Sequence, residues 1–169
     1  MKMWYVVNSK PQKETFLCEH FRLRGIETYY PCIKVQPVNP RAHKIKPYFP
    51  GYLFINVNFT EGILYELRWL PGAIGLVGFG GDLATVSDDL LQRIKLGVDE
   101  INKMGSKVLD GLEPGVPIVI RDGPFEGFEA IFDARLSGNK RVRVLLELLK
   151  GHPYRLELPV EQIECIKQS

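Results

Sequence analysis

"PYFPGYLFINVNF", residues 47–59, is an aromatic Pro-Gly segment that leads directly into an uninterrupted apolar run. In an extended chain successive side chains point to opposite sides, so Tyr52 and Phe54 fall on one side and Leu53 and Ile55 on the other. Because both sides are apolar, the pattern predicts a central strand that is buried on both faces. Such a strand needs neighbouring strands and helices that cover it.

The chain before this strand supplies the expected neighbours. Residues 3–9 are rich in aromatic and β-branched side chains and predict a strand. Residues 12–24 contain no glycine or proline and predict a helix, which Gly25 ends at the position where a left-handed residue is commonly needed. Residues 27–38 predict a second strand.

The chain after the strand continues the same alternation. Residues 61–70 predict a short helix, and residues 73–79 predict another strand. Ser87 is followed by two aspartates and is a good N-cap for a helix that runs to about Glu100. We therefore expect an α+β fold, an antiparallel sheet flanked by helices.

The C-terminal part has a different character. Residues 102–112 lose all periodicity, which predicts a linker between a domain at 1–101 and a second at 113–169. Within the second domain, the segments "VPIVI", "GFEAIFDAR", "RVRVLLELL" and "YRLELPVEQIECI" predict short strands of a small β-barrel. The leucines at 145–149 also fit a helix, so a helical hairpin stays open, although strand alternation and two prolines favour the barrel.

Composition excludes several classes of protein. The apolar fraction of 45% and charged fraction of 25% are those of a folded globular chain. No apolar run approaches the ~20 residues of a membrane helix, and the N-terminus lacks the features of a signal peptide. The cysteines, Cys18, Cys32 and Cys165, are odd in number and widely spaced. A cytoplasmic protein with no membrane segment is expected.

Positive charge is concentrated at the N-terminal end. Residues 1–48 hold nine Lys/Arg against three Glu, a net charge of +6. The net charge of residues 49–120 is −4, and that of residues 121–169 is zero. Such an excess attracts phosphates, although scattered lysines are more often a solvated surface. Charge alone therefore gives only a weak indication of nucleic-acid binding.

Catalysis has little support in the residue pattern. Cys18 and His20 are the pair that a cysteine hydrolase would need, but two residues apart on a helix they point to different faces. No metal-ligand spacing, phosphate loop or dinucleotide fingerprint occurs. We expect a protein that is not an enzyme and has no metal or cofactor. Loss of an activity on alanine substitution at these two residues would support the hydrolase instead.

Four motifs resemble those of one family. "WYVV" at 4–7, "YFPGYLF" at 48–54, "LPGAIGLVG" at 70–78 and "GPFEGFEAIF" at 123–132 occur in the order and at the separations of the NusG family of transcription elongation and antitermination factors. The resemblance implies an N-terminal domain that binds RNA polymerase and a C-terminal KOW domain, a five-stranded barrel. "GFEAIF" and "VLLELL" look closer to the specialised RfaH-type paralogues.

The resemblance also implies site residues and partners. The polymerase clamp helices would be bound, and pausing suppressed, by an apolar pocket that includes Phe49, Tyr52, Phe54, Phe79 and Ile94. The non-template DNA strand would be met by Lys10 and His20. The stretch Ile63 to Glu66 differs from the His-Thr-Thr-Thr of RfaH, so a contact to the polymerase gate loop is not carried over. The protein would act as a monomer.

The KOW domain implies further partners. A small-subunit ribosomal protein would be bound by Phe125, Leu148 and Leu149, which would couple transcription to translation. Binding of the Rho terminator is left open, because Lys150 stands where many NusG proteins have an aromatic residue. As in RfaH, a helical hairpin could cover the polymerase pocket. A ribosome-associated KOW module that binds RNA is the alternative function, although it predicts a basic barrel and this segment is neutral.

Overall fold

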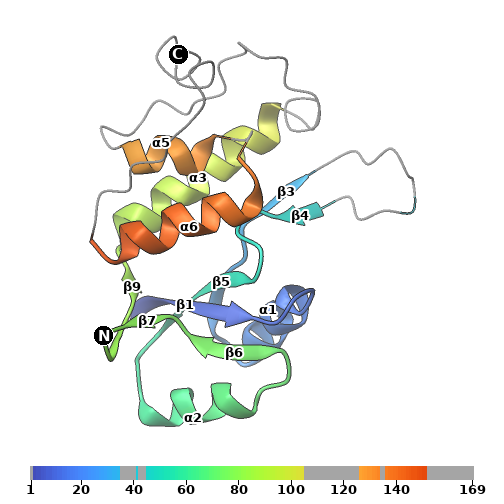
Figure 1. The fold of residues 1–169 in the computed structure, drawn as a ribbon. Helices are drawn as coiled ribbons and strands as arrows, with labels where there is room; N and C mark the ends of the chain where they lie inside the picture. Colours follow the sequence, from blue (N-terminus) through green and yellow to red (C-terminus); the bar gives the residue numbers. More distant parts are fainter. Residues whose placement is uncertain (1, 35–40, 42–44, 105–125, 134–135, 152–169) are drawn as a thin grey trace. The chain divides into compact units, whose positions relative to one another are not determined.

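The computed structural model describes residues 2–34, 41, 45–104, 126–133 and 136–151 (Figure 1). The chain divides into two compact units. The first comprises Met1–Pro31 with Phe49–Gln92, and the second comprises Cys32–Tyr48 with Arg93–Ser169.

The first unit is built on an antiparallel sheet with the strand order β2-β5-β1-β6, and a further strand, β9, also pairs with β1 (Figure 1). A small hairpin, β7 with β8, follows β6 in the chain. The elements of this unit are β1 (Met3–Ser9), α1 (Glu14–Leu23), β2 (Glu27–Tyr29), β5 (Tyr52–Val57), α2 (Glu61–Trp69), β6 (Ala73–Leu76), β7 (Gly78–Phe79), β8 (Asp82–Leu83) and β9 (Thr85–Val86).

The prediction of a central strand is confirmed. β5 lies between β1 and β2, and Leu53, Phe54 and Ile55 are all 0% exposed. An uninterrupted apolar run is what a strand with packing on both faces requires, because neither side of the pleat meets water. The predicted strand at 3–9 and the short helix at 61–70 are also present, as β1 and α2.

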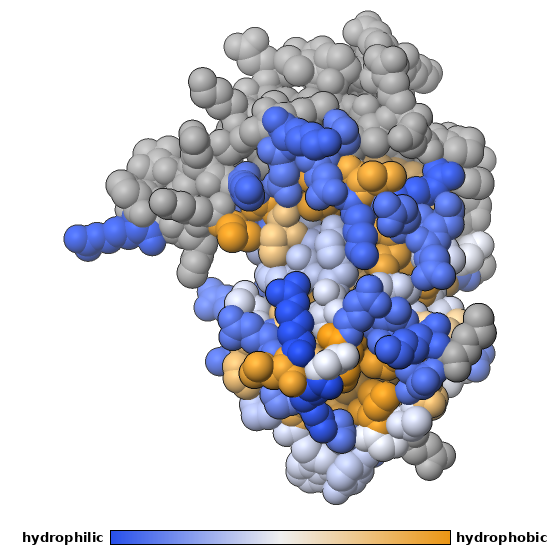
Figure 2. Space-filling view, turned by 180° about the vertical axis from the view of Figure 1, so that it is seen from behind, coloured by the Kyte–Doolittle hydropathy of each residue, from blue (hydrophilic) through white to orange (hydrophobic). Residues whose placement is uncertain are grey.

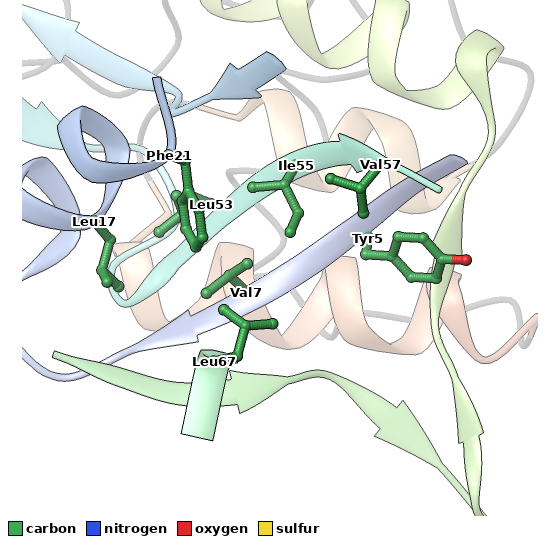
Figure 3. Packing of buried hydrophobic residues seen from close by; sticks show 8 residues of the cluster. All are labelled: Tyr5, Val7, Leu17, Phe21, Leu53, Ile55, Val57 and Leu67. Carbon is green, nitrogen blue, oxygen red and sulfur yellow. The ribbon is translucent and has the colours of Figure 1, made fainter. Parts of the chain in front are cut away.

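One face of this sheet carries the main hydrophobic core, and α1 and α2 cover it. Figure 3 shows side chains of β1 and β5 meeting those of the two helices. The spacing is two along each strand and four along α1, as expected for a sheet face and a helix face in contact. The core residues are Tyr5, Val7, Leu17, Phe21, Leu53, Ile55, Val57 and Leu67.

The end of α1 follows the sequence-based prediction. Gly25 has φ +76°, in the left-handed region that glycine adopts without steric cost. The Ile26 N–H donates to the Phe21 carbonyl at 2.9 Å and the Gly25 N–H to the Arg22 carbonyl at 3.0 Å. These two bonds form a Schellman motif, which satisfies carbonyls that the helix end would otherwise leave without donors.

The second predicted strand, at 27–38, is divided in the structure. β2 ends at Tyr29, and β3 (Cys32–Lys34) pairs instead with β4 (Ile45–Pro47) in a separate two-stranded ribbon. Pro31 lies between them, and a proline has no N–H to donate to a ladder, which favours an interruption. Residues 35–38 lie outside the described part of the chain.

The second unit contains this ribbon and three helical segments, including most of α3. The Ser87 hydroxyl accepts the Leu90 N–H at 3.1 Å, which confirms the predicted N-cap of α3. The helix continues through Asn102, so the first residues of the predicted linker are helical. The helices are α3 (Asp88–Met104), α5 (Glu126–Phe132) and α6 (Gly138–Leu149).

The strands predicted in "GFEAIFDAR" and "RVRVLLELL" are not observed, because residues 127–132 lie in α5 and residues 141–149 lie in α6. The Ser137 side chain accepts the Lys140 N–H at 3.3 Å and caps α6. Leu, Glu, Lys and Arg favour helix, whereas the alternation of "RVRV" favours strand, so the local pattern permits both structures. The helical alternative is therefore the observed one for these residues. The other predicted barrel strands lie outside the described residues.

Among the described residues, none of the helices has both the length and the apolar composition that a membrane span requires.

Candidate functional site

An aromatic cluster, formed by Tyr29, Phe49 and Phe54, lies on the sheet face opposite the main core. The Tyr29 and Phe54 rings are stacked with centroids 6.1 Å apart, and the Phe49 ring meets Phe54 edge-on at 6.2 Å. Phe54 alternates with Leu53 and Ile55 along β5, so its ring points away from α1 and α2. Stacked and edge-to-face rings each add to the stabilisation that area burial gives.

The five predicted polymerase-binding residues are buried to different degrees. Phe49, Phe54 and Ile94 are 0% exposed, whereas Tyr52 and Phe79 are half-buried. Phe49 and Phe54 are in ring contact, and Tyr52 projects from the same face of β5. Whether these residues contact polymerase stays a prediction. In the observed state Phe49, Phe54 and Ile94 present no accessible surface.

Ile94 is buried on α3, between two positions of that helix that α5 contacts. A Cβ added to Gly97, one turn further along α3, would stand 2.2 Å from the Phe132 ring of α5. The Arg93 guanidinium lies 5.2 Å from the centroid of the Phe128 ring, also on α5. The positions on either side of Ile94, Arg93 and Gly97, therefore both contact α5. Only a glycine at position 97 lets that helix approach so closely.

A buried arginine connects α6 to the end of the β3–β4 ribbon. Arg141 is 5% exposed, and its Nε donates to the Tyr48 carbonyl at 2.9 Å. Its guanidinium carbon lies 4.5 Å from the Tyr48 ring centroid, and its Nη1 donates to the Leu136 carbonyl. The Tyr48 hydroxyl donates to the Ile131 carbonyl at the end of α5. We call these contacts the Arg141–Tyr48 clamp.

Burial lowers the pKa of the Arg141 guanidinium, while the neighbouring Tyr48 and Asp133 raise it. An arginine stays protonated through such shifts, because its usual pKa is far above neutrality. A buried cation is tolerated when acceptors and an aromatic face replace water. The sequence reasoning did not assign this clamp. The available signal was an arginine at the start of an apolar run that was expected to be a strand.

The predicted DNA-binding residues both lie in the first unit. Lys10 follows β1 and is exposed, and its backbone N–H donates to the Gly72 carbonyl at 2.8 Å. His20 is half-buried on α1, with its ring 6.3 Å from the rings of both Phe16 and Phe21. A cation and a flat ring are the groups that contact single-stranded nucleic acid. Their DNA contact remains a prediction.

The predicted KOW partner surface is only partly described. Leu148 and Leu149 are half-buried in the last turn of α6, and Phe125 lies outside the described residues. Lys150 forms the C-cap of α6, and its side chain contacts Glu147 at 3.2 Å. Ribosome binding by this surface therefore stays untested.

The pair considered for nucleophilic catalysis lacks the geometry for it. Cys18 is buried, and this burial raises the pKa of its thiol, which disfavours the reactive thiolate. It packs on the core side of α1, while His20 contacts aromatic rings. Among the described residues, no group of three or more His, Cys, Asp or Glu side chains could hold a metal ion.

Exposed apolar side chains are scattered over the surface. Figure 2 shows hydrophobic patches interrupted by hydrophilic side chains on one face of the molecule. Tyr65 and Trp69 of α2 form one exposed pair, with ring centroids 6.2 Å apart and exposed fractions of 64% and 73%. Single apolar residues at a surface are normal, so these features alone assign no partner.

Comparison with known proteins gives the same class of protein as the sequence motifs. The family model described as "Transcription termination factor nusG" matches residues 2–95, more than half of the chain. Curated relatives named "Transcription termination/antitermination protein NusG" are 26% identical over 176 residues in Escherichia coli K12 and 27% identical over 181 residues in Pseudomonas aeruginosa. They cover 96% and 98% of this chain, and 96% and 99% of their own lengths are matched.

A solved structure described as "Domain interaction in Thermotoga maritima NusG" is also similar, with a TM-score of 0.42 and 19% identity over 75% of this chain and 68% of the other. The family model and the full-length relatives identify a transcription termination/antitermination factor. The chain belongs to the NusG family.

Proposed function

We propose that this protein binds the clamp helices of RNA polymerase and suppresses transcriptional pausing. In the first unit the proposed contacts are the aromatic cluster, Tyr52 and Phe79, and in the second unit the proposed contact is Ile94. A factor that binds the closed, elongating clamp more tightly than the open one raises the population of the closed state. The protein itself makes or breaks no bond in this function.

The observation that carries this proposal is the aromatic cluster itself. The core of the first unit is complete on the other sheet face, where α1 and α2 cover it. Phe49, Phe54 and Tyr29 are additional large rings on the second face. Aromatic residues are enriched at the centres of protein interfaces, where they fill pockets and exclude water.

The helical hairpin of α5 and α6 supports a regulatory step. It covers the face of α3 that carries Ile94, through the contacts of Gly97 with Phe132 and Arg93 with Phe128. We propose that this hairpin must move before polymerase contacts Ile94. The apparent affinity is then reduced by the fraction of molecules in which the surface is open.

Replacement of Tyr52 tests the binding surface. Tyr52 is half-buried, so Tyr52→Ala removes ring area with less damage to the fold than a change at Phe49. We expect polymerase affinity to fall about tenfold, the effect of losing one interface anchor. The control is Tyr65→Ala on α2. Equal affinity of Tyr52→Ala and the unchanged protein, or no effect of the unchanged protein on pausing in purified transcription, would contradict the proposal.

Replacement of Arg141 tests the regulatory step. Arg141→Met keeps an unbranched apolar side chain but removes the donors to the Tyr48 and Leu136 carbonyls. We expect the hairpin to leave α3 and polymerase affinity to rise severalfold. Arg143→Met is the control, because Arg143 is exposed on the same helix. If Arg141→Met loses helical structure without a gain in affinity, the hairpin does not restrict polymerase binding.

Other partners are extensions of the same proposal. We propose that Lys10 and His20 contact the non-template DNA strand, and that Leu148 and Leu149, with Phe125, contact a small-subunit ribosomal protein. The sequence leaves Rho open, because Lys150 replaces the aromatic residue that many relatives have. A cytoplasmic location and a monomeric state fit this role.

A further inference from the structure

The solvent side of α1 carries an aromatic pair that the core of the first unit does not use. Phe16 is 46% exposed, and its ring centroid lies 6.3 Å from that of His20, with 32° between the ring planes. The two residues are one turn apart, so their rings are neighbours along the helix surface. Leu17 and Phe21 of the same helix pack into the core instead. Phe16 therefore offers flat aromatic surface to solvent beside a second ring.

The turn between β1 and α1 is strained at one residue. Gln12 has φ +64°, and it is the only residue other than glycine that has a positive φ in the described part of the chain. In this left-handed region a Cβ lies too close to the following carbonyl oxygen. The Lys13 N–H donates to the Lys10 carbonyl at 3.1 Å and closes a turn with Pro11 and Gln12 at its centre. In a type II turn the residue after the proline needs a positive φ, and glycine is the usual choice.

Neighbouring residues hold this turn in place. The Lys10 N–H donates to the Gly72 carbonyl at 2.8 Å, and a Cβ added to Gly72 would stand 2.9 Å from the Lys13 Cβ. Gln12 is exposed, and its carboxamide makes no hydrogen bond to the described residues that would offset the strain. Strained residues in a fixed backbone cluster at binding sites. Because a glycine would remove the strain, the side chain of Gln12 indicates a contact outside the chain.

The charges of the turn suit a phosphate backbone. Lys10 and Lys13 are exposed at the two ends of the turn. Of the two acids of α1, Glu14 is 6% exposed and accepts the Tyr30 hydroxyl at 3.2 Å, whereas Glu19 is exposed. Lysines contact phosphates, and these contacts position a strand without reading its sequence. The turn therefore supplies cations for a strand that runs beside the aromatic pair.

The residue types favour a single strand over a duplex or a protein partner. An aromatic ring stacks on an unpaired base, whereas the bases of a duplex are stacked on each other. The carboxamide of glutamine has both a donor and an acceptor, which match N7 and N6 of adenine. A protein that docked on Phe16 by apolar contact would not need a strained Gln12 beside it.

We propose that Phe16 stacks on an unpaired base of single-stranded DNA and that Gln12 hydrogen-bonds to the edge of a base in the same strand, with a preference for adenine. The inference rests on the proposed contact of Lys10 and His20 with the non-template strand. It adds to that contact the two residues that bind and select a base.

Replacement of Phe16 tests the stacking contact. Anisotropy at low salt measures the affinity of the full-length protein for a fluorescent strand of about 12 deoxythymidines with one adenine at its centre. We expect Phe16→Ala to weaken binding on the order of tenfold, the effect of losing one stacked base, and Phe16→Trp to keep it. The matched control is Tyr65→Ala, which removes a ring that is 64% exposed on α2. This control should bind the strand as the unchanged protein does.

Replacement of Gln12 separates a role in binding from a role in the turn. Gln12→Gly relieves the backbone strain, so the midpoint of thermal unfolding should rise. We expect the unchanged protein to prefer the strand with the central adenine over an all-thymine strand by about fivefold or more, and Gln12→Gly to lose this preference. A residue with only a structural role would raise the midpoint and leave the adenine preference unchanged.

Three outcomes would overturn the proposal. The first is an equal loss of affinity in Phe16→Ala and Tyr65→Ala. The second is an adenine preference that is absent in the unchanged protein or persists in Gln12→Gly. The third is tighter binding of single-stranded RNA of the same sequence, or of a DNA duplex of the same length.

Two parallel measurements distinguish this failure from failure of the proposed function. If Lys10→Gln weakens binding of the strand and Phe16→Ala does not, the proposed strand contact stands and the base contact is wrong. Affinity for polymerase without nucleic acid should be the same in Phe16→Ala and the unchanged protein. Absence of polymerase binding by the unchanged protein would contradict the proposed clamp contact alone.

Discussion

Strand β5 and helix α6 are both apolar segments, but they are held in different ways. β5 is held by hydrogen bonding to two neighbouring strands, since β1 pairs with it along Tyr52–Val57 and β2 pairs with Phe54, Ile55 and Asn56. Helix α6 makes its backbone hydrogen bonds within itself, and it is held by packing against α5 and by the contacts of Arg141 with Tyr48 and Leu136.

The two segments therefore differ in whether they can adopt a second secondary structure. A strand in the centre of a sheet cannot change structure without breaking two ladders, whereas a self-contained helix can be exchanged for another structure when a few contacts are lost. In "RVRVLLELL", residues 141–149, the first residues alternate as in a strand and the leucines at 145–149 also fit a helix. We expect the contacts of the Arg141–Tyr48 clamp to favour the helix.

The largest expected effects come from deleting one buried leucine in each region. Leu53 and Leu145 are both 0% exposed. Leu53→Ala should lower the free energy of unfolding of the first unit by about 2–5 kcal/mol, since the sheet has no alternative structure. Leu145→Ala should destabilise only the helical form of the C-terminal segment.

Residue-resolved hydrogen exchange under native conditions measures both effects. In Leu145→Ala, amides of residues 138–149 should exchange faster while those of β5 keep their protection. If Leu145→Ala also removes protection from β5, the two regions unfold as one cooperative unit and the distinction drawn above is wrong.

A smaller effect is expected at Gly97. Alanine normally stabilises a helix interior by about 1 kcal/mol relative to glycine. At position 97 the added Cβ would stand 2.2 Å from the Phe132 ring, so Gly97→Ala should instead destabilise the packed form by about 1–3 kcal/mol. Gly62→Ala in α2 is the matched control, because its nearest neighbour would be the Thr60 hydroxyl at 3.6 Å.

Thermal unfolding followed by circular dichroism gives the sign of each change. The control should be neutral or stabilising, and Gly97→Ala should lose helical signal at lower temperature. A stabilising Gly97→Ala would mean that α5 does not pack against α3 in solution.

The smallest effects are expected from removal of the N-caps of α2 and α6. Thr60 and Ser137 each accept an N–H of the first turn at 3.3 Å, in α2 and α6. Replacement of either by alanine removes about 1 kcal/mol. We expect Thr60→Ala only to fray the start of α2, because Leu67 is anchored in the core. Ser137→Ala should reduce the total helical content. The loss of the same capping energy lowers the population of helical α6 relative to a strand structure of these residues. Equal changes in dichroism would contradict this expectation.

The sheet was predictable because its signals are local and agree. The apolar run of β5, the left-handed Gly25 and the Ser87 cap each act within a few residues, and all three were read correctly from the sequence. The division of the strand at 27–38 was missed, although Pro31 was a visible warning.

The helical structure of α5 and α6 was not predictable in this way. Its local preferences are balanced, and the deciding contacts join residues far apart in the chain, Arg141 with Tyr48 and Gly97 with Phe132. For the candidate site, the motifs indicated the aromatic residues by resemblance. They gave no information about how deeply Phe49 and Phe54 are buried.

Asn102 has a consequence for association between molecules. An exposed strand edge is a template on which another chain can add a strand, and short ribbons are vulnerable to this. Here the carboxamide takes the place of a neighbouring strand, because it occupies both the Lys34 N–H and the Cys32 carbonyl. A single side chain thus protects this edge from β-sheet aggregation. Asn102→Ala would leave it open to intermolecular pairing at high protein concentration.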